Sequence, residues 1–202
     1  MKIILEKSST IIGKIGRIID NYPYTHIAIS FDDENYLSFS RRRHHNPFDS
    51  GFTIEKLNYY AYKLNQEVEL KEYELDINEE KKKEIEAFIN EISDYPFDIY
   101  GMIKTNLNHG RKKDNAYNCM TFIGRILEIL EIPLIREEYY KNNIKDLENA
   151  LINYGLKGKI RRIRCEKEDE FYMKRVNLIE KISSFIKLNK KLIEKKWLIF
   201  NK

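Results

Sequence analysis

The chain has 202 residues and a mass of 24.3 kDa, enough for one domain with a sizeable core and an appendage. Its formal net charge of +4 is uneven: residues 159–202 hold 14 Lys and Arg against 6 Asp and Glu, a surplus of 8. A basic tail of this kind either contacts an anionic partner, such as nucleic acid or a membrane surface, or forms a solvated helix face.

Several classes of protein are excluded by composition. Two cysteines at unrelated positions do not make a disulfide framework, and no Cys/His cluster has zinc-ligand spacing. The first apolar run is broken by charge after three residues, and no apolar stretch approaches the roughly 18 residues of a membrane-spanning helix. We therefore expect a cytoplasmic, soluble protein without a signal peptide, a transmembrane segment, a metal or another cofactor.

The N-terminal part of the chain predicts short strands around one amphipathic helix. Apolar runs predict strands at residues 2–5, 25–31 and 36–40, with a tight acidic connection at 32–35. Residues 8–20 have the apolar spacing of a helix that two glycines weaken.

A histidine begins the strand predicted at residues 25–31. Alternation places His26 on the less apolar face of this strand, together with Ala28 and Ser30. Such a histidine is either structural or, with a nucleophile nearby, a catalytic base. Ser38 is a polar residue on the otherwise hydrophobic neighbouring strand, where its hydroxyl can orient the imidazole.

Residues 41–52 are predicted to form a loop, because the segment contains Pro and Gly and begins with three arginines. His44 and His45 are expected to lie in this loop and to line a substrate entrance. The arginines are either solvated or contact an anion.

The remaining elements are mostly helical. Alternating apolar residues predict a strand at 68–75, and another is expected at 159–164. Helix patterns cover residues 78–92, 98–107 and 143–154, and residues 167–200 are expected to form one or two helices with a break near 187–189.

The most informative stretch is a periodic helix that begins at Cys119. Its apolar positions share one face: Phe122, Ile123, Ile126, Leu127 and Leu130. Asn118 or Asn115 is the expected cap, so Cys119 falls within the first turn. The free amides and positive dipole there favour thiolate over thiol and can hold an oxyanion. The alternative is a cysteine that is merely packed in a core.

Two short motifs resemble those of a known family. Thr25-His-Ile-Ala-Ile followed by a turn and a strand, and Tyr117-Asn-Cys-Met-Thr-Phe-Ile at a helix start, are similar to the circularly permuted NlpC-type papain-like domain. That group includes YiiX-type bacterial proteins and relatives of lecithin:retinol acyltransferase. The run Asn46-Pro-Phe-x-x-Gly-Phe-x-x-Glu55, preceded by Ser38-Phe-x-Arg41, resembles uncharacterised low-GC bacterial members. The resemblance covers roughly residues 10–165.

This resemblance implies a fold and a set of roles. It implies an α+β, circularly permuted papain-like domain over residues 1–165, with an antiparallel sheet packed on helices, followed by a basic helical extension over 166–202. By resemblance, Cys119 is the nucleophile, His26 the general base, Ser38 the orienting group and Tyr117 an aid to the oxyanion. Serine departs from the usual third residue, which is His, Glu, Asn or Gln, and Met120 replaces a common serine.

Three hypotheses of function follow. The first is a cysteine hydrolase or acyltransferase that acts on an amide, a peptide or a lipid ester. The second is a catalytically inactive binding or effector module on the same fold, which contacts anionic partners through its basic loop and tail. The third is a purely structural protein.

Overall fold

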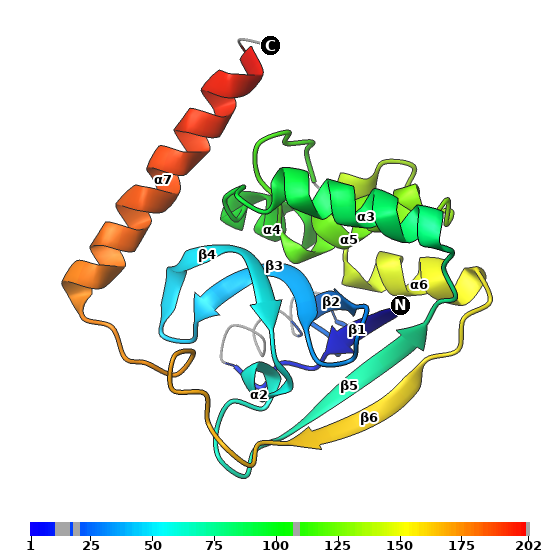
Figure 1. Cartoon of the computed structure of the whole chain (residues 1–202), viewed down its shortest axis with the longest axis horizontal. Coiled ribbons are helices and arrows are strands. Elements are labelled where there is room, and N and C mark those ends of the chain that lie inside the picture. Colours follow the sequence, from blue (N-terminus) through cyan, green and yellow to red (C-terminus); the bar gives the residue numbers. More distant parts are fainter. Residues whose placement is uncertain (11–16, 18–20, 107–109, 201–202) are drawn as a thin grey trace.

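The computed structural model describes residues 1–10, 17, 21–106 and 110–200 (Figure 1). The helix predicted over residues 8–20 lies mostly outside the described residues, and so does the last residue of the helix predicted over 98–107.

Within the described residues, six strands form one sheet in the order β4-β3-β2-β1-β5-β6, and every neighbouring pair is antiparallel. The strands are β1 (Lys2–Glu6), β2 (His26–Ser30), β3 (Tyr36–Arg43), β4 (Asn46–Glu55), β5 (Glu67–Glu74) and β6 (Lys159–Arg164). The expectation of an α+β protein with an antiparallel sheet is confirmed.

Most helices lie together on one side of the sheet, whereas α7 extends along the edge strand β4 (Figure 1). The helical elements are α2 (Leu57–Tyr60), α3 (Glu79–Ile92), α4 (Ile99–Asn106), α5 (Cys119–Ile129), η1 (Tyr139–Lys141), α6 (Ile144–Asn153) and α7 (Leu178–Phe200). Helix α5 packs its apolar face directly on strands β2 and β3. It therefore forms the centre of the helical layer.

The alternation along β2 divides its side chains between two cores. Ile27 and Ile29 pack with the apolar face of α5, whereas Ala28 packs on the other face with Tyr60 and Cys165. Both cores consist of fully buried side chains, whose removal from water supplies the main driving force for folding. The alternation expected for residues 25–31 is confirmed.

The prediction of a loop over residues 41–52 is wrong. This segment is a hairpin, in which β3 continues to Arg43 and β4 begins at Asn46, with a turn at His44 and His45. Proline is tolerated at Pro47 because β4 is an edge strand, where an amide donor is not required on the outer side. A register shift near Arg43 accommodates the irregularity.

The break predicted near residues 187–189 is also wrong, because α7 is one continuous helix. Leu188 lies at that point and is 7% exposed, so burial holds the helix there. The Asn189 amide donates a hydrogen bond to the Phe185 carbonyl one turn earlier, at 2.8 Å. An asparagine that bonds back to its own helix does not end it.

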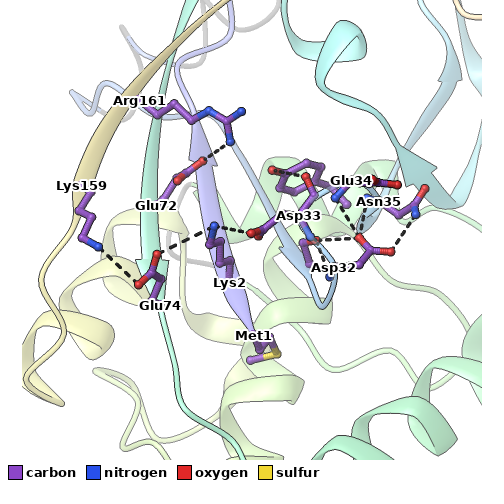
Figure 2. Close-up of polar contacts among 12 residues, drawn as sticks. Met1, Lys2, Asp32, Asp33, Glu34, Asn35, Glu72, Glu74, Lys159 and Arg161 are labelled. Atoms are coloured by element: carbon purple, nitrogen blue, oxygen red, sulfur yellow. Dashed lines mark hydrogen bonds and ion pairs between the residues drawn. The ribbon is translucent and has the colours of Figure 1, made fainter.

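The end of the sheet around Lys2 is held by charged contacts between strands (Figure 2). The Lys2 ammonium lies 2.7 Å from Asp33 and 3.9 Å from Glu74, and Lys159 lies 3.4 Å from the same Glu74. Exposed pairs of this kind contribute little energy, about 1 kcal/mol or less each. They help to fix the register of β1, β5 and β6. They lie at the Lys2 end of β1, and the cavity described below lies at its Glu6 end. Among the helices that the structure describes, none is long and apolar enough to cross a membrane.

Candidate active site

Cys119 is the first residue of α5, and its position is fixed by a cap. The Asn118 side chain accepts a hydrogen bond from the Thr121 amide at 3.0 Å, and the Thr121 hydroxyl accepts one from the Asn118 amide at 2.9 Å. This reciprocal arrangement confirms Asn118 as the cap. The cap holds Cys119, which is 4% exposed, at the positive end of the helix dipole.

His26 is the first residue of β2, and its imidazole lies close enough to the Cys119 side chain that their interaction raises the pKa of His26. Strand β2 runs under α5, so the packing of Ile27 and Ile29 against the helix also sets the place of the histidine. Thiol and imidazole line the same cavity. The structure thus brings together the two residues that the sequence singled out.

One nitrogen of the His26 imidazole, Nε2, contacts Glu55, the last residue of β4. Its carboxylate oxygens lie 2.9 and 3.1 Å from His26 Nε2. The Tyr60 hydroxyl donates to the same carboxylate at 2.7 Å. Because Nε2 is engaged by Glu55, the nitrogen left for the thiol of Cys119 is Nδ1.

Electrostatics favour a charged pair in this buried place. Burial lowers the pKa of His26, but the charge of Glu55 and the hydrogen bonds with Cys119 and Glu55 outweigh it and hold that pKa well above its ordinary value. Burial raises the pKa of Glu55, but the His26 charge and hydrogen bond outweigh this and lower it. The imidazole is therefore held as imidazolium next to a carboxylate.

Ser38, predicted to orient the imidazole, has a different role. Its side chain is fully buried and donates a hydrogen bond to the Ile27 carbonyl at 2.8 Å. It therefore satisfies a backbone acceptor between β3 and β2, and Glu55 orients His26 instead. The sequence did contain a hint of this, because Glu55 closes the run that resembles bacterial relatives.

Tyr117, predicted to assist the oxyanion, packs away from the thiol. Its ring lies among Phe39, Phe88 and Tyr95. Burial raises the pKa of this phenol. The residues that line the cavity with Cys119 do not include Tyr117. The donors that remain near the sulfur are the first backbone amides of α5, which have no partners within the helix.

The cavity has a volume of about 290 Å³ and a mostly apolar wall. Aromatic and aliphatic side chains form most of this wall: Phe39, Tyr59, Tyr60, Tyr62, Phe97, Ile99, Met102 and Tyr172. Polar side chains of the wall include Glu6, Arg41 and Ser50, and among the described residues the buried Ser50 hydroxyl has no hydrogen-bond partner. A site of this composition suits an apolar substrate with one reactive polar group.

The arginines of the hairpin are not equivalent. Arg43 lies 2.6 Å from Asp49, and Arg42 lies 3.7 Å from the same carboxylate. Arg41 lines the cavity and donates to the Tyr172 hydroxyl at 3.3 Å. His44 stacks near Tyr62, and burial lowers the pKa of His44 to about 4. Neither His44 nor His45 belongs to the cavity wall.

Glu6 is a site residue that sequence reasoning missed. It ends β1 directly opposite His26 in the β1–β2 register, and it is 7% exposed at the cavity. Burial raises the pKa of Glu6 to about 7; the charge of Glu55 adds to this rise, and the charges of His26 and Arg41 oppose it. In the sequence it reads as a charge that simply closes a strand.

The Glu6 carboxyl is expected to make stability depend on pH. Since its pKa rises from 4.5 in the unfolded chain to about 7 in the folded protein, the folded state binds the proton more tightly across that window. The free energy of unfolding should fall as pH rises from 4.5 to 7, by about 3 kcal/mol at most. Urea unfolding of wild type and Glu6→Gln at pH values across this window measures this fall, which should be much smaller in Glu6→Gln. Glu34→Gln, in an exposed turn, is the control and should keep the pH dependence of wild type. Parallel pH profiles for wild type and Glu6→Gln would contradict the assignment.

Within the described part of the chain, no group of three or more His, Cys, Asp and Glu side chains could hold a metal ion. Comparison with models of protein families gives no match, and no curated protein matches the sequence.

Proposed function

We propose that this protein is a cysteine-dependent hydrolase or acyltransferase that acts on an amide, a peptide or a lipid ester. The observation that carries the proposal is the continuous set of contacts from Cys119 through His26 to Glu55 at one cavity. A nucleophile, a base and a group that orients the base are the parts that covalent acyl transfer requires.

The chemistry follows from the contacts. In the reactive pair the proton of Cys119 is already held by His26 as imidazolium, and the thiolate attacks the substrate carbonyl to form a carbon–sulfur bond and an oxyanion. The first amides of α5 stabilise this oxyanion, and such a donor typically contributes about 3 kcal/mol. The oxyanion collapses, and the leaving group departs with the proton from His26. Water or another nucleophile, deprotonated by His26, then attacks the thioester and restores the thiol.

The order of these residues along the chain supports a permuted papain-like domain. The histidine strand and the Glu55 strand precede the cysteine helix, as the resemblance to NlpC-type relatives implies. Glu55 is also among the third residues that the resemblance leads one to expect, and serine is not. With Glu55 in place of Ser38 as the third residue, the chain no longer departs from the family pattern at that position.

The test of the proposal is the reactivity of the two thiols towards iodoacetamide at neutral pH. Cys119 should react faster than Cys165 by on the order of tenfold or more, because only Cys119 is paired with an imidazolium. Cys165 lies in the second core, and burial raises its pKa. Mass spectrometry of the two peptides over time gives both rates, and equal rates would refute the proposal.

A second candidate is a binding module with a silent site, and the observation that favours it is the lysine-rich helix α7. The two candidates differ in the thiol test above, since a silent site needs no activated cysteine.

A further inference from the structure

Over residues 178–196, where the structure describes its side chains, helix α7 packs against the body of the protein by one side. Leu188 is buried on that side, and the Asn46 amide donates to the Ser184 hydroxyl at 2.9 Å. Farther along, the Asn115 amide donates to the Leu192 carbonyl at 2.9 Å, and Lys195 lies 2.6 Å from Asp94. At 100° per residue, the contacts made by α7 residues therefore share one face of the helix.

The side of α7 turned away from these contacts carries an apolar stripe, which we define as Ile179, Ile182, Ile186 and Ile193. Their spacing of three, four and seven residues aligns them on one face. Each is between 51% and 77% exposed. Ile179, Ile182 and Ile186 lie on successive turns, and Ile193 lies two turns further along the same face. An exposed apolar surface of this kind marks a docking site.

Lysines lie on both sides of the apolar stripe. By helical position, Lys187 and Lys190 follow one edge, and Lys196 follows the other. The helix holds 6 lysines and 2 glutamates between Leu178 and Phe200, a surplus of 4 positive charges. Lys195 is paired with Asp94 on the packed side, and Lys190 lies 3.7 Å from Glu194. The edges of the apolar stripe therefore carry a net positive charge.

We propose that α7 is an interfacial anchor that docks this protein on an anionic lipid bilayer, with the apolar stripe inserted among the acyl chains and the lysines at the headgroups. An apolar face with lysines at its edges is the pattern of helices that lie in the plane of a membrane. A second copy of the chain is the weaker occupant, because two such helices would bring like charges together. A lipid surface with anionic headgroups neutralises them.

The anchor is joined to the wall of the cavity through β4. The ring of Phe48 contacts that of Phe185 on α7 at 5.1 Å between centroids, and the neighbouring Pro47 and Ser50 line the cavity. Tyr172, in the segment that leads into α7, lines it too. Docking of α7 would thus hold the cavity close to the bilayer. The anchor itself does not depend on the proposed chemistry, since none of its residues touches Cys119 or His26.

The experiment is flotation of the full chain with vesicles of phosphatidylcholine, with and without added phosphatidylglycerol. Wild type should float with the anionic vesicles and much less with the neutral ones. The matched pair of variants is Ile182→Asp, in the apolar stripe, and Ser183→Asp, on the exposed polar side. Both add one negative charge at adjacent positions, but only Ile182→Asp should lower binding further, by about tenfold relative to Ser183→Asp, because it removes a buried side chain from the lipid. Ile186→Asn should weaken binding without adding charge.

Two more measurements complete the test. Replacement of Lys187 and Lys190 with glutamine should weaken binding about fivefold per lysine at low salt, and the loss should shrink as salt rises. The outcomes that would overturn the proposal are a wild type that stays with neither vesicle, or Ile182→Asp and Ser183→Asp that bind equally. A wild type that light scattering shows to be a dimer, broken by Ile182→Asp without any vesicle binding, would assign the stripe to a second copy. Failure of the thiol test would leave all these results unchanged.

Discussion

Replacement of Cys119 with alanine is expected to abolish the hydrolysis of p-nitrophenyl acetate, because the carbon–sulfur bond of the intermediate cannot form. Replacement of His26 with alanine should slow hydrolysis by about 10²- to 10⁴-fold, the usual contribution of a positioned base. The release of p-nitrophenolate measures both rates. Mass spectrometry of wild type stopped during turnover should show one acetyl group on Cys119.

Cys165→Ala is the control for this experiment. Cys165 is a small buried side chain in the second core and takes no part in the site, so this variant should retain full activity while it loses a thiol. If Cys119→Ala hydrolyses the ester as fast as wild type, or if the acetyl group is found on another residue, the assignment of the nucleophile is wrong.

Most elements of the fold could be predicted because their signals are local. The helix at Cys119 has its cap and its apolar face within a few residues of each other, and the structure places it at Cys119–Ile129. The helix at Glu79–Ile92 has an equally local pattern. The spacing of apolar residues predicts both helices because each buries one face in the same helical layer.

The third residue of the site could not be predicted because it depends on register. Residues 41–52 contain Pro47 and Gly51, which interrupt the alternation of a strand, so the segment reads as a loop and the end of β4 has no defined partner. Pairing of β3 with β4 places Glu55 opposite Tyr36. Only that hairpin, together with the packing of Tyr60, brings the carboxylate to His26. Sequence favours Ser38 because it is a polar residue on the otherwise hydrophobic neighbouring strand.

The role of Glu6 at the site also depends on strand pairing that the sequence does not reveal. A charged residue after three apolar ones is typical of the solvated end of a strand, but pairing of β1 with β2 and the wall of the cavity bury it. Burial of a charge costs energy, and proteins usually keep such groups where they serve a site. The free-energy cost of burying Glu6 can be recognised only from the three-dimensional structure.

Replacement of Glu55 with glutamine is expected to lower the rate of ester hydrolysis by about 10²- to 10⁴-fold, although glutamine has nearly the same shape. The carboxylate raises the pKa of His26, so its removal should lower that pKa and leave the imidazole neutral at neutral pH. The neutral ring no longer stabilises the thiolate of Cys119. An NMR titration of the His26 ring should show protonation lost at a lower pH than in wild type, and alkylation of Cys119 at neutral pH should slow in parallel.

The matched control for Glu55→Gln is Ser38→Ala, which tests the role that the sequence suggested. Ser38 donates to the Ile27 carbonyl, so its loss should cost about 1 kcal/mol of unfolding free energy and leave hydrolysis and the His26 titration unchanged. The pH dependence of the unfolding free energy also distinguishes the two residues. The pair of His26 with Glu55 stabilises the fold below the ordinary pKa of histidine, and this stabilisation is lost as pH rises through the higher pKa that His26 has in the folded protein. Wild type and Ser38→Ala should both lose this stability in alkaline solution, whereas Glu55→Gln should lack it throughout. A shifted titration in Ser38→Ala, with none in Glu55→Gln, would return the orienting role to the serine.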